Sequence, residues 1–227
     1  MEEEAKAIQE VARTAGKAID AARQAGGFIA KFVQGPLQEG IGIFEDYLKY
    51  LRWERQVRLF RRAEELLAAS GLSAPTRSVP LKIAIPIIQG AILEDDDDLQ
   101  DRWAALLVNA ANASFEGEIR RSYAVILEQL TALDASILDV LYSLPFEQSR
   151  HAGIVTAELP ARAHIKEERE KVGRFPREEV TISLSNLARL GCLRPAVTYG
   201  GGESFIWVNP TVAGRAFVRA CSPPRAT

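Results

Sequence analysis

The chain has 227 residues, of which 47% are hydrophobic and 26% are charged. This length and composition are typical of one large or two small globular domains, and they exclude a disordered, collagen-like or disulfide-stapled protein. Lys and Arg number 28 against 30 Asp and Glu, so the formal charge of −2 gives no global basis for nucleic-acid binding. Cys192 and Cys221 lack metal-ligand spacing and are expected to be buried free thiols, which fits a reducing cytosol.

Signals for export and for crossing a membrane are missing from the sequence. The chain opens with glutamates at residues 2–4, whereas a secretory signal opens with basic residues. The most apolar stretch, residues 80–93, is interrupted by Lys82 and Gln89 and is shorter than the ~18–20 apolar residues that span a bilayer. We therefore expect a cytoplasmic protein without a transmembrane helix.

Residues 1–34 are predicted to form an amphipathic N-terminal helix, ended by Gly35 and Pro36. Small apolar side chains recur in a heptad pattern and make a narrow seam, which favours close pairing with another helix, in the fold or in an oligomer. The other face of this helix is basic, and the aromatic residues Phe28 and Phe32 lie near its end. The alternative is therefore peripheral contact with an anionic inner-membrane surface. Self-association or a protein partner is the favoured interpretation.

A long helix is expected from about residue 43 to residue 70, closed by Gly71. The candidate contacts for an anionic partner on this helix are Lys49, Arg52, Arg55, Arg58 and Arg62. Most of these positions are three or four residues apart and share one helix face, where they can bind phosphates of nucleic acid or lipid. The competing and favoured interpretation is internal ion pairing with the acidic residues 94–98 and Asp101.

The next two helices are predicted to form the core of a bundle. After a turn-rich linker at residues 70–78, an apolar helix starts at Pro80, kinks near Pro86 and is expected to be the central buried helix. The helix after the acidic run has one apolar face, formed by Leu99, Trp103, Leu106, Leu107 and Ala110. Because consecutive acids at a helix start point in different directions, the run is expected to complement the helix dipole and not to bind a divalent cation.

The C-terminal part of the sequence changes character. The predicted elements are a loop at 109–118, a helix at 123–133, a helix capped by Asp134 through residue 144, a polar connection holding His151, a helix at 161–172 carrying His164, a helix at 176–190, strands at 193–199 and 204–208, and a short helix from Pro210. Glycines 200–202 separate the two strands and predict a hairpin. Helices followed by such a hairpin are typical of a winged-helix arrangement.

These elements predict a mainly α fold, with a helical bundle followed by a C-terminal winged-helix-like unit that has one β-hairpin. The predicted domains are the N-terminal helix at 1–34, a helical bundle domain at 35–131 and a winged-helix-like domain at 132–227. Trp103 and Leu106 are expected to be buried in the bundle.

The sequence indicates no catalytic residue, no metal site and no cofactor site. His151 and His164 lie in polar surroundings without paired-ligand spacing, and glycines 200–202 follow a strand-to-strand pattern that no phosphate loop has. The candidate recognition helix of the winged-helix-like unit opens with Glu178 and Glu179, whose carboxylates repel a DNA backbone. Protein contact is therefore favoured, and a winged-helix DNA-binding regulator is the alternative.

Three segments of the sequence are distinctive. They are RSVPLKIAIPIIQGAILEDDDDLQDRWAALLVNAA at 77–111, GPLQEGIGIFEDYLKYLRWERQ at 35–56 and NPTVAGRAFVRAC at 209–221. The first combines a proline-started apolar helix, a small-residue turn, an acidic run and LQDxWAxLLxNA. Together these segments resemble the abortive-infection alpha family of bacterial proteins. The resemblance implies a cytosolic protein associated with defence against phage and carries over no catalytic residues. We expect a non-enzymatic defence protein that acts through protein–protein or membrane-surface contacts.

Overall fold

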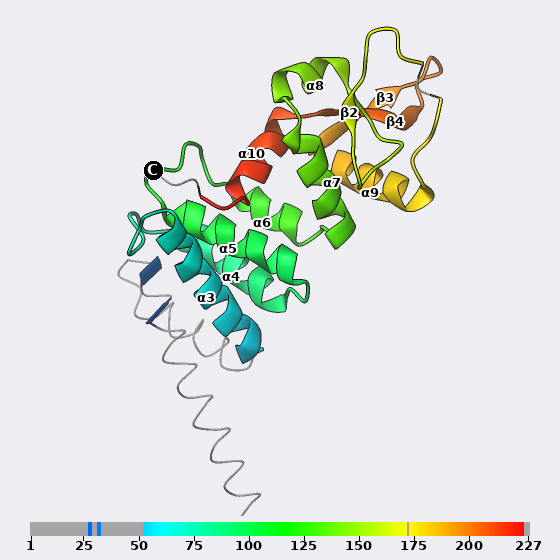
Figure 1. Ribbon diagram of the computed structural model, residues 1–227. Coiled ribbons are helices and arrows are strands. Elements are labelled where there is room, and N and C mark those ends of the chain that lie inside the picture. The colour runs from blue at the N-terminus through cyan, green and yellow to red at the C-terminus, as the bar shows by residue number, and fades with distance from the viewer. Residues whose placement is uncertain (1–26, 29–30, 33–51, 172, 225–227) are drawn as a thin grey trace, which may run out of the picture. The chain divides into compact units, whose positions relative to one another are not determined.

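The computed structural model describes residues 27–28, 31–32, 52–171 and 173–224 (Figure 1). The described residues are mainly helical and include one antiparallel sheet of four strands. The predicted predominance of helix and the predicted hairpin are confirmed, but the sheet has two more strands than the sequence indicated, and these form a second antiparallel pair. The chain divides into two compact units, which are described separately below. Unit 1 comprises residues 1–124 and 223–227, and unit 2 is Val125–Ser222.

Unit 1 is built on three helices that contact one another: α3 (Trp53–Ala69), α4 (Leu81–Leu93) and α5 (Asp97–Ala111). The core lies around α5, whose second half, from Trp103 to Ala111, is buried at every position. The expectation that α4 is the central buried helix is wrong. The buried residues of α4 form one face, and Lys82 and Leu93 are exposed, whereas α5 is buried on all faces in its second half and contacts both α3 and α4.

The ends of the unit 1 helices follow their local sequence. Gly71 has a φ of 78°, and Leu72 N–H donates to the Leu67 carbonyl over 3.0 Å, which closes α3 at the predicted glycine. Pro80 is the N-cap of α4 and not its first residue. Asp96 caps α5 by accepting a 2.9 Å hydrogen bond from Leu99 N–H, which leaves the next acids in the first turn to complement the helix dipole.

Gly90 of α4 lies directly against the Trp103 ring of α5. The sequence pattern suggested a small-residue turn here, but Gly90 lies inside α4. A Cβ added at Gly90 would lie 2.6 Å from Trp103 Cζ2, so only glycine leaves room for the indole ring. Trp103 is 1% exposed and Leu106 is fully buried, which confirms the prediction that both belong to the core.

A short N-terminal segment completes the core of unit 1. Residues 27–28 and 31–32 are helical, and the Phe28 ring stacks on Phe60 with centroids 4.1 Å apart. Phe32 is 1% exposed, and its carbonyl accepts a 2.9 Å hydrogen bond from Val79 N–H. These two aromatic side chains are therefore packed within unit 1. The rest of the predicted helix at 1–34 lies outside the described residues, as does Lys49.

Unit 2 contains a small sheet surrounded by helices. Its elements are α7 (Ala132–Ser143), α8 (Phe146–Ala152), β1 (Ile154–Val155), β2 (His164–Ile165), α9 (Glu178–Arg189), β3 (Leu193–Val197), β4 (Glu203–Pro210) and α10 (Val212–Ala220). The strand order is β2-β1-β4-β3, and every neighbouring pair is antiparallel. The long hairpin β3–β4 contains a register shift between Pro195 and Ala196. The helix α6 (Arg121–Leu127) begins in unit 1 and ends in unit 2.

Two predicted helices of this region are wrong in part or in whole. The helix predicted at 123–133 ends at Leu127, and α7 begins at Ala132. Asp134 is the third residue of α7 and not its cap, because Thr131 is the N-cap and forms a capping box with the Asp134 carboxylate. The helix predicted at 161–172 does not form, since this charged segment has no apolar stripe and instead pairs through β2 with β1.

The connection predicted between Pro145 and residue 161 also contains regular structure. The helix α8 includes His151, and β1 follows directly after it. With seven residues, α8 is too short to show a helical period in the sequence. The predicted helix at 176–190 corresponds to α9, and the predicted terminal helix corresponds to α10.

One partly buried hydrogen-bond cluster joins distant segments of unit 2. The Tyr142 hydroxyl of α7 donates to the Cys192 carbonyl and accepts from Thr211 N–H over 3.1 Å. Gly214 of α10 packs against the same groups, where an added Cβ would lie 2.9 Å from Cys192 Cα and closer still to Tyr142 Oη. Burial raises the pKa of Tyr142 to about 12. The side chain therefore stays a neutral hydroxyl at physiological pH.

Candidate functional site

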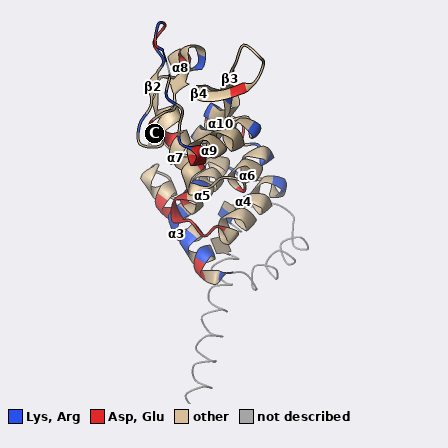
Figure 2. Cartoon of the chain, turned by 90° about the vertical axis from the view of Figure 1, so that its right-hand side faces the viewer, with Lys and Arg blue, Asp and Glu red and all other residues tan. Residues whose placement is uncertain are grey.

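Four of the basic residues singled out in the sequence, Arg52 at the N-cap of α3 and Arg55, Arg58 and Arg62 within it, face the acidic segment that precedes and opens α5 (Figure 2). Arg52 pairs with Asp95, and Arg55 pairs with Asp97. Further along α3, Arg58 Nη1 lies 3.0 Å from Asp101 Oδ1, and Arg62 Nε lies 2.8 Å from Asp101 Oδ2. We call these four arginines and three aspartates the Arg–Asp cluster.

Gln100 connects the Arg–Asp cluster to the interior of unit 1. This side chain is fully buried, and its Nε2 donates to the carbonyls of Arg55 (3.1 Å) and Ala91 (2.7 Å). Its Oε1 accepts a 2.9 Å hydrogen bond from Arg58 Nη1. One glutamine thus joins α3, α4 and α5, and all of its hydrogen bonds are made within unit 1.

The charges of the Arg–Asp cluster stabilise one another. A hydrogen bond from Arg55, together with the charge of Arg58, lowers the pKa of Asp97. The pKa of Arg62 is raised, mainly by its hydrogen bond to Glu65 and also by Asp101. Since most of these groups are at least partly exposed, each pair contributes little by itself. The cluster holds α3 against the start of α5, in keeping with the favoured interpretation of the sequence. Binding of an anionic partner by Arg52, Arg55, Arg58 or Arg62 stays a prediction.

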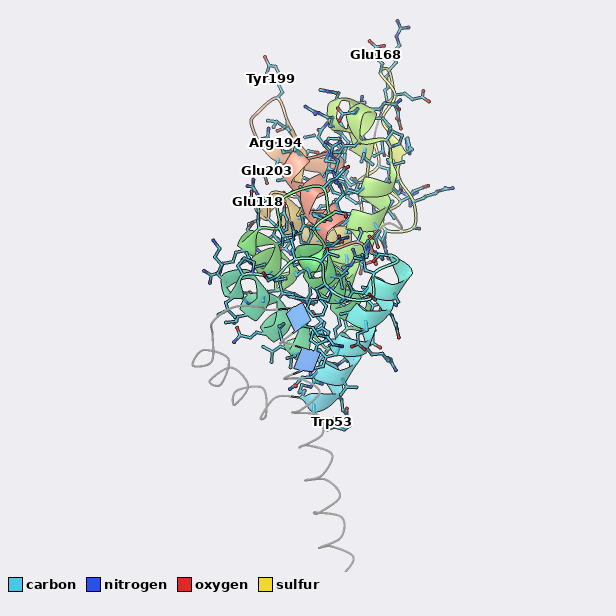
Figure 3. The ribbon with its side chains drawn as sticks, turned by 90° about the vertical axis from the view of Figure 1, so that its left-hand side faces the viewer. Trp53, Glu118, Glu168, Arg194, Tyr199 and Glu203 are labelled. Atoms are coloured by element: carbon cyan, nitrogen blue, oxygen red, sulfur yellow. The ribbon has the colours of Figure 1, made fainter. Side chains whose placement is uncertain are left out.

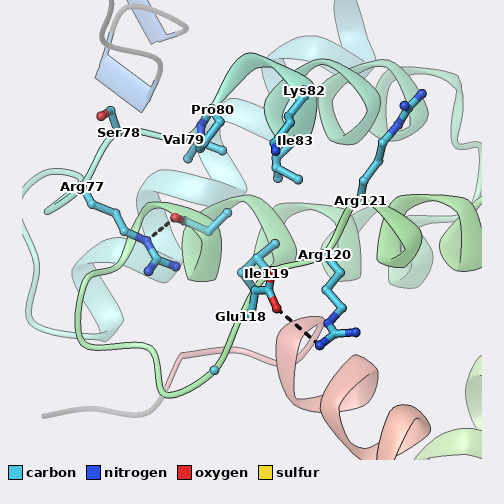
Figure 4. A pocket seen from close by; sticks show the side chains of 12 residues that line it. Arg77, Ser78, Val79, Pro80, Lys82, Ile83, Glu118, Ile119, Arg120 and Arg121 are labelled. Atoms are coloured by element: carbon cyan, nitrogen blue, oxygen red, sulfur yellow. Dashed lines mark hydrogen bonds and ion pairs between the residues drawn. The ribbon is translucent and has the colours of Figure 1, made fainter.

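A pocket of about 860 Å³ opens beside the first turn of α4 (Figure 4). We call it the α4 pocket. It is lined by Arg77, Ser78, Val79, Pro80, Lys82, Ile83, Ala110, Gly117, Glu118, Ile119, Arg120 and Arg121. All of these residues belong to unit 1. Four of the lining side chains are cationic and one is acidic, so the pocket is positive although the whole chain has a formal charge of −2.

Two of the four cations of the α4 pocket have hydrogen-bond or ion-pair partners within the described residues, and two do not. Arg77 donates from Nε to the Ala110 carbonyl over 2.6 Å, which satisfies a carbonyl at the C-terminal end of α5. Arg120 pairs with Glu118 over 3.3 Å. Lys82 and Arg121 are exposed and have no hydrogen bond or ion pair within the described residues. Sequence reasoning missed this pocket because its cations come from two separate segments, at 77–82 and 120–121, that meet only in the fold.

The two histidines considered in the sequence analysis lie at the surface of unit 2. His151 is exposed on α8. His164 Nε2 lies 2.9 Å from Glu170 Oε1, and this contact lowers the pKa of the Glu170 carboxyl. His164 also lines a pocket of about 460 Å³ together with Glu158, Arg162 and Arg174. The Glu158 carboxylate is already paired with Arg162.

The described part of the chain holds neither a cluster of metal ligands nor a membrane-spanning helix. No group of three or more His, Cys, Asp or Glu side chains in that part of the chain is arranged to hold a metal ion. Every helix found there is too short or too polar to cross a membrane. Cys192 and Cys221 are buried and form no disulfide, and burial raises the pKa of the Cys192 thiol to about 12.

The sequence and the fold were compared with known proteins. Neither the curated protein sequences nor the solved structures contain a match to this chain. The family "Abortive infection alpha" matches residues 54–221, a range that runs from α3 to the residue after α10. Of the three segments that resemble this family, those at 77–111 and 209–221 lie inside the match, and most of the segment at 35–56 lies before it. The chain belongs to the abortive infection alpha family.

Proposed function

We propose that this protein takes part in abortive-infection defence of a bacterium against phage, and that it acts through non-covalent contacts and not through catalysis. The observation that carries the proposal is the family match over residues 54–221. Ion pairing supports the non-catalytic part, because the charged groups of the Arg–Asp cluster and the Glu158–Arg162 pair neutralise one another at exposed or partly exposed positions. Such pairs lack the desolvation that tunes catalytic groups.

The architecture that we propose for unit 2 is winged-helix-like. In support, β1, β4 and β3 are adjacent in the sheet, the hairpin β3–β4 follows α9, and α7 packs on α9. Asn186 of α9 donates to the Asp134 carboxylate of α7 over 3.1 Å, which fixes the two helices together. One departure from the arrangement is the segment between β1 and α9, where the structure has strand β2.

The surface that we propose for partner contact consists of α9 and the β3–β4 hairpin. Ile182 on α9 is 64% exposed, and Tyr199 extends from the tip of the hairpin (Figure 3). Exposed apolar and aromatic side chains favour a protein partner. Glu178 and Glu179 open α9, and Glu179 already pairs with Arg177 over 2.8 Å. This acidic helix start argues against phosphate contact and therefore against DNA.

Phage plating on cells with and without the gene tests the defence role. We expect fewer plaques when the protein is produced, and equal plaque counts would contradict the proposal. The non-catalytic part is tested by incubating the purified protein with DNA, RNA and nucleoside triphosphates. We expect no turnover, and a nuclease or nucleotide-cleaving activity that copurifies with the protein would overturn this part.

The alternative of a DNA-binding regulator is tested by gel shift of the full chain with duplex DNA over a salt titration. We expect no salt-sensitive complex at physiological ionic strength. A complex whose affinity falls steeply with salt, and which is lost on substitution of Arg194 in β3, would replace protein contact by DNA binding.

For the N-terminal segment we propose helix pairing, in self-association or with a partner, in preference to membrane contact. The burial of Phe28 and Phe32 in unit 1 supports this choice, since these aromatics were the strongest candidates for lipid insertion. The test compares the full chain with a chain that begins at Gly26, which keeps both phenylalanines. We expect a smaller oligomer after truncation and no flotation of either chain with anionic liposomes. Flotation of the full chain alone would favour the membrane.

A further inference from the structure

The α4 pocket contains positive charges that the described residues of unit 1 do not neutralise. Arg77 is occupied by the carbonyls of Ala110 and Asn109, and Arg120 is occupied by Glu118. Lys82 and Arg121 line the same pocket without any such partner in the described part of the chain (Figure 4). Two exposed cations at one pocket give it a positive potential, which favours the approach of an anion.

The first turn of α4 adds backbone donors to these side chains. Pro80 is the N-cap and offers no side-chain hydrogen bond to the helix. The N–H groups of Leu81 and Lys82 have no acceptor among the described residues, whereas those of Ile83 and Ala84 bond to the Pro80 carbonyl. Free N–H groups and the positive end of the helix dipole both favour an anion at this position.

The C-terminal end of α5 also borders the pocket, and its carbonyls would repel an anion. Arg77 removes this repulsion, because its guanidinium donates to Ala110 and Asn109 at 2.6 Å and 3.1 Å. The same arginine therefore completes α5 and keeps the pocket positive.

The inner surface of the α4 pocket is apolar. Val79, Ile83, Ala110 and Ile119 contribute aliphatic side chains to it. A volume of about 860 Å³ is within the range of small-molecule pockets and exceeds what a bare phosphate fills. The combination of a cationic rim and an aliphatic floor suits a ligand that has a multiply charged anionic group and an uncharged body.

We propose that the α4 pocket binds a small organic phosphate of nucleotide size. Lys82, Arg121 and the first turn of α4 hold the phosphate group, and Ile83 and Ile119 contact the uncharged body. A phosphate fits this rim better than a carboxylate does, because it accepts several hydrogen bonds and carries more than one negative charge. This inference does not depend on the proposed defence role or on its contact surface in unit 2.

Isothermal titration calorimetry of the full chain tests the proposal with three probes: ATP, inorganic pyrophosphate and adenosine. We expect ATP to bind most tightly, pyrophosphate to bind more weakly, and adenosine to give no detectable heat. The affinity for ATP should fall as salt is raised. Absence of binding by both ATP and pyrophosphate would overturn the site, and equal affinity for these two probes would overturn the role of the apolar floor.

Two variants assign the binding to the pocket. Lys82→Gln with Arg121→Gln removes both unpaired cations at exposed positions, and we expect ATP binding to weaken by roughly tenfold or more, about 1.4 kcal/mol per factor of ten. Lys171→Gln with Arg194→Gln is the matched control, since it makes the same change of charge at exposed positions of unit 2. Equal weakening in the two double variants would show a non-specific charge effect and contradict the proposal.

The variant Ile119→Ser tests the floor of the pocket. We expect it to weaken ATP while leaving the affinity for pyrophosphate within about twofold, because only the uncharged body of the ligand contacts this side chain. Loss of both affinities, or of neither, would contradict the assigned orientation. Circular dichroism of each variant confirms that the chain is folded before binding is measured.

Discussion

The two units of this protein differ in where their polar interactions lie. In unit 1 the core around α5 is mostly apolar, with Gln100 as a buried polar side chain, and the ion pairs of the Arg–Asp cluster lie at its edge. In unit 2 the main polar interactions are internal, where Tyr142 and Thr211 join three segments that are far apart in the sequence. Unit 1 therefore combines an apolar core with one fully buried glutamine, whereas unit 2 joins distant segments through partly buried hydroxyl groups and a close approach of Gly214 to Cys192.

The largest expected effect concerns the core of unit 1. We expect Trp103→Ala to lower the free energy of unfolding in urea by about 3–5 kcal/mol, because it leaves a cavity at a side chain that is 1% exposed. Trp53→Ala is the matched control, since Trp53 is 48% exposed, and it should change the stability by less than about 1 kcal/mol. Equal effects of the two substitutions would contradict a core centred on α5.

Gly214→Ala should have the next largest effect, in unit 2. The added methyl group meets the Tyr142 hydroxyl and the backbone of Cys192, which cannot move aside as a flexible side chain can. We expect a loss of about 3 kcal/mol, at the upper end for overpacking, measured by thermal unfolding. Gly173→Ala is the control, because nothing lies within 4 Å of a Cβ at that position. A melting temperature that Gly214→Ala leaves unchanged would refute this close contact.

Tyr142→Phe separates the hydrogen bonds of unit 2 from its packing. We expect a loss of about 0.5–1.5 kcal/mol at pH 7, since the ring stays and only the hydroxyl is removed. Because the folded pKa of Tyr142 is raised from 10.0 to about 12, its contribution is complete below pH 10 and is lost as the pH rises toward 12. The wild type should therefore lose more stability than the variant over this range. Parallel pH profiles would contradict a buried hydroxyl.

The smallest expected effect is in the Arg–Asp cluster. A double-mutant cycle of Arg58→Met and Asp101→Asn should give a coupling energy of about 0.2–1 kcal/mol that decreases as salt is raised. Arg61→Met with Glu65→Gln provides the comparison, because this pair is more exposed and its atoms are 3.6 Å apart. A coupling of several kcal/mol at Arg58 and Asp101 would show that unit 1 also depends on polar contacts, and would remove the contrast between the units.

The sequence predicts the elements of unit 1 better than those of unit 2, because helices are specified by local signals and strands depend on distant partners. The helices α4 and α5 are specified by local signals, namely periodic apolar residues, a proline start and an acidic first turn. The spacing of Arg55 and Arg58 likewise identified the face that pairs with the acidic segment. By contrast, β2 forms because it pairs with β1. The residues at 161–172 carry no local signal that indicates this pairing.

Sites made of separate segments are the hardest to find in a sequence. Arg77, Lys82 and Arg121 meet at the α4 pocket because the linker before α4 and the loop after α5 fold onto the same end of two helices. Each of them looks like an ordinary surface cation when the sequence is read alone. The need for glycine at position 90 is equally hard to predict from the sequence. It arises because the Trp103 ring of the next helix occupies the space that a Cβ would fill.

The most direct test of the central claim is the number of phage progeny released per infected cell, measured for three proteins. These are the wild type, the double variant Ile182→Ser with Tyr199→Ser, and the control Val212→Ser, which changes another exposed apolar side chain of unit 2. We predict that the wild type and the control reduce the yield, and that the double variant does not although it accumulates as a folded protein. A yield that is the same with and without the gene, or full protection by the double variant, would contradict defence through the surface of α9 and the β3–β4 hairpin.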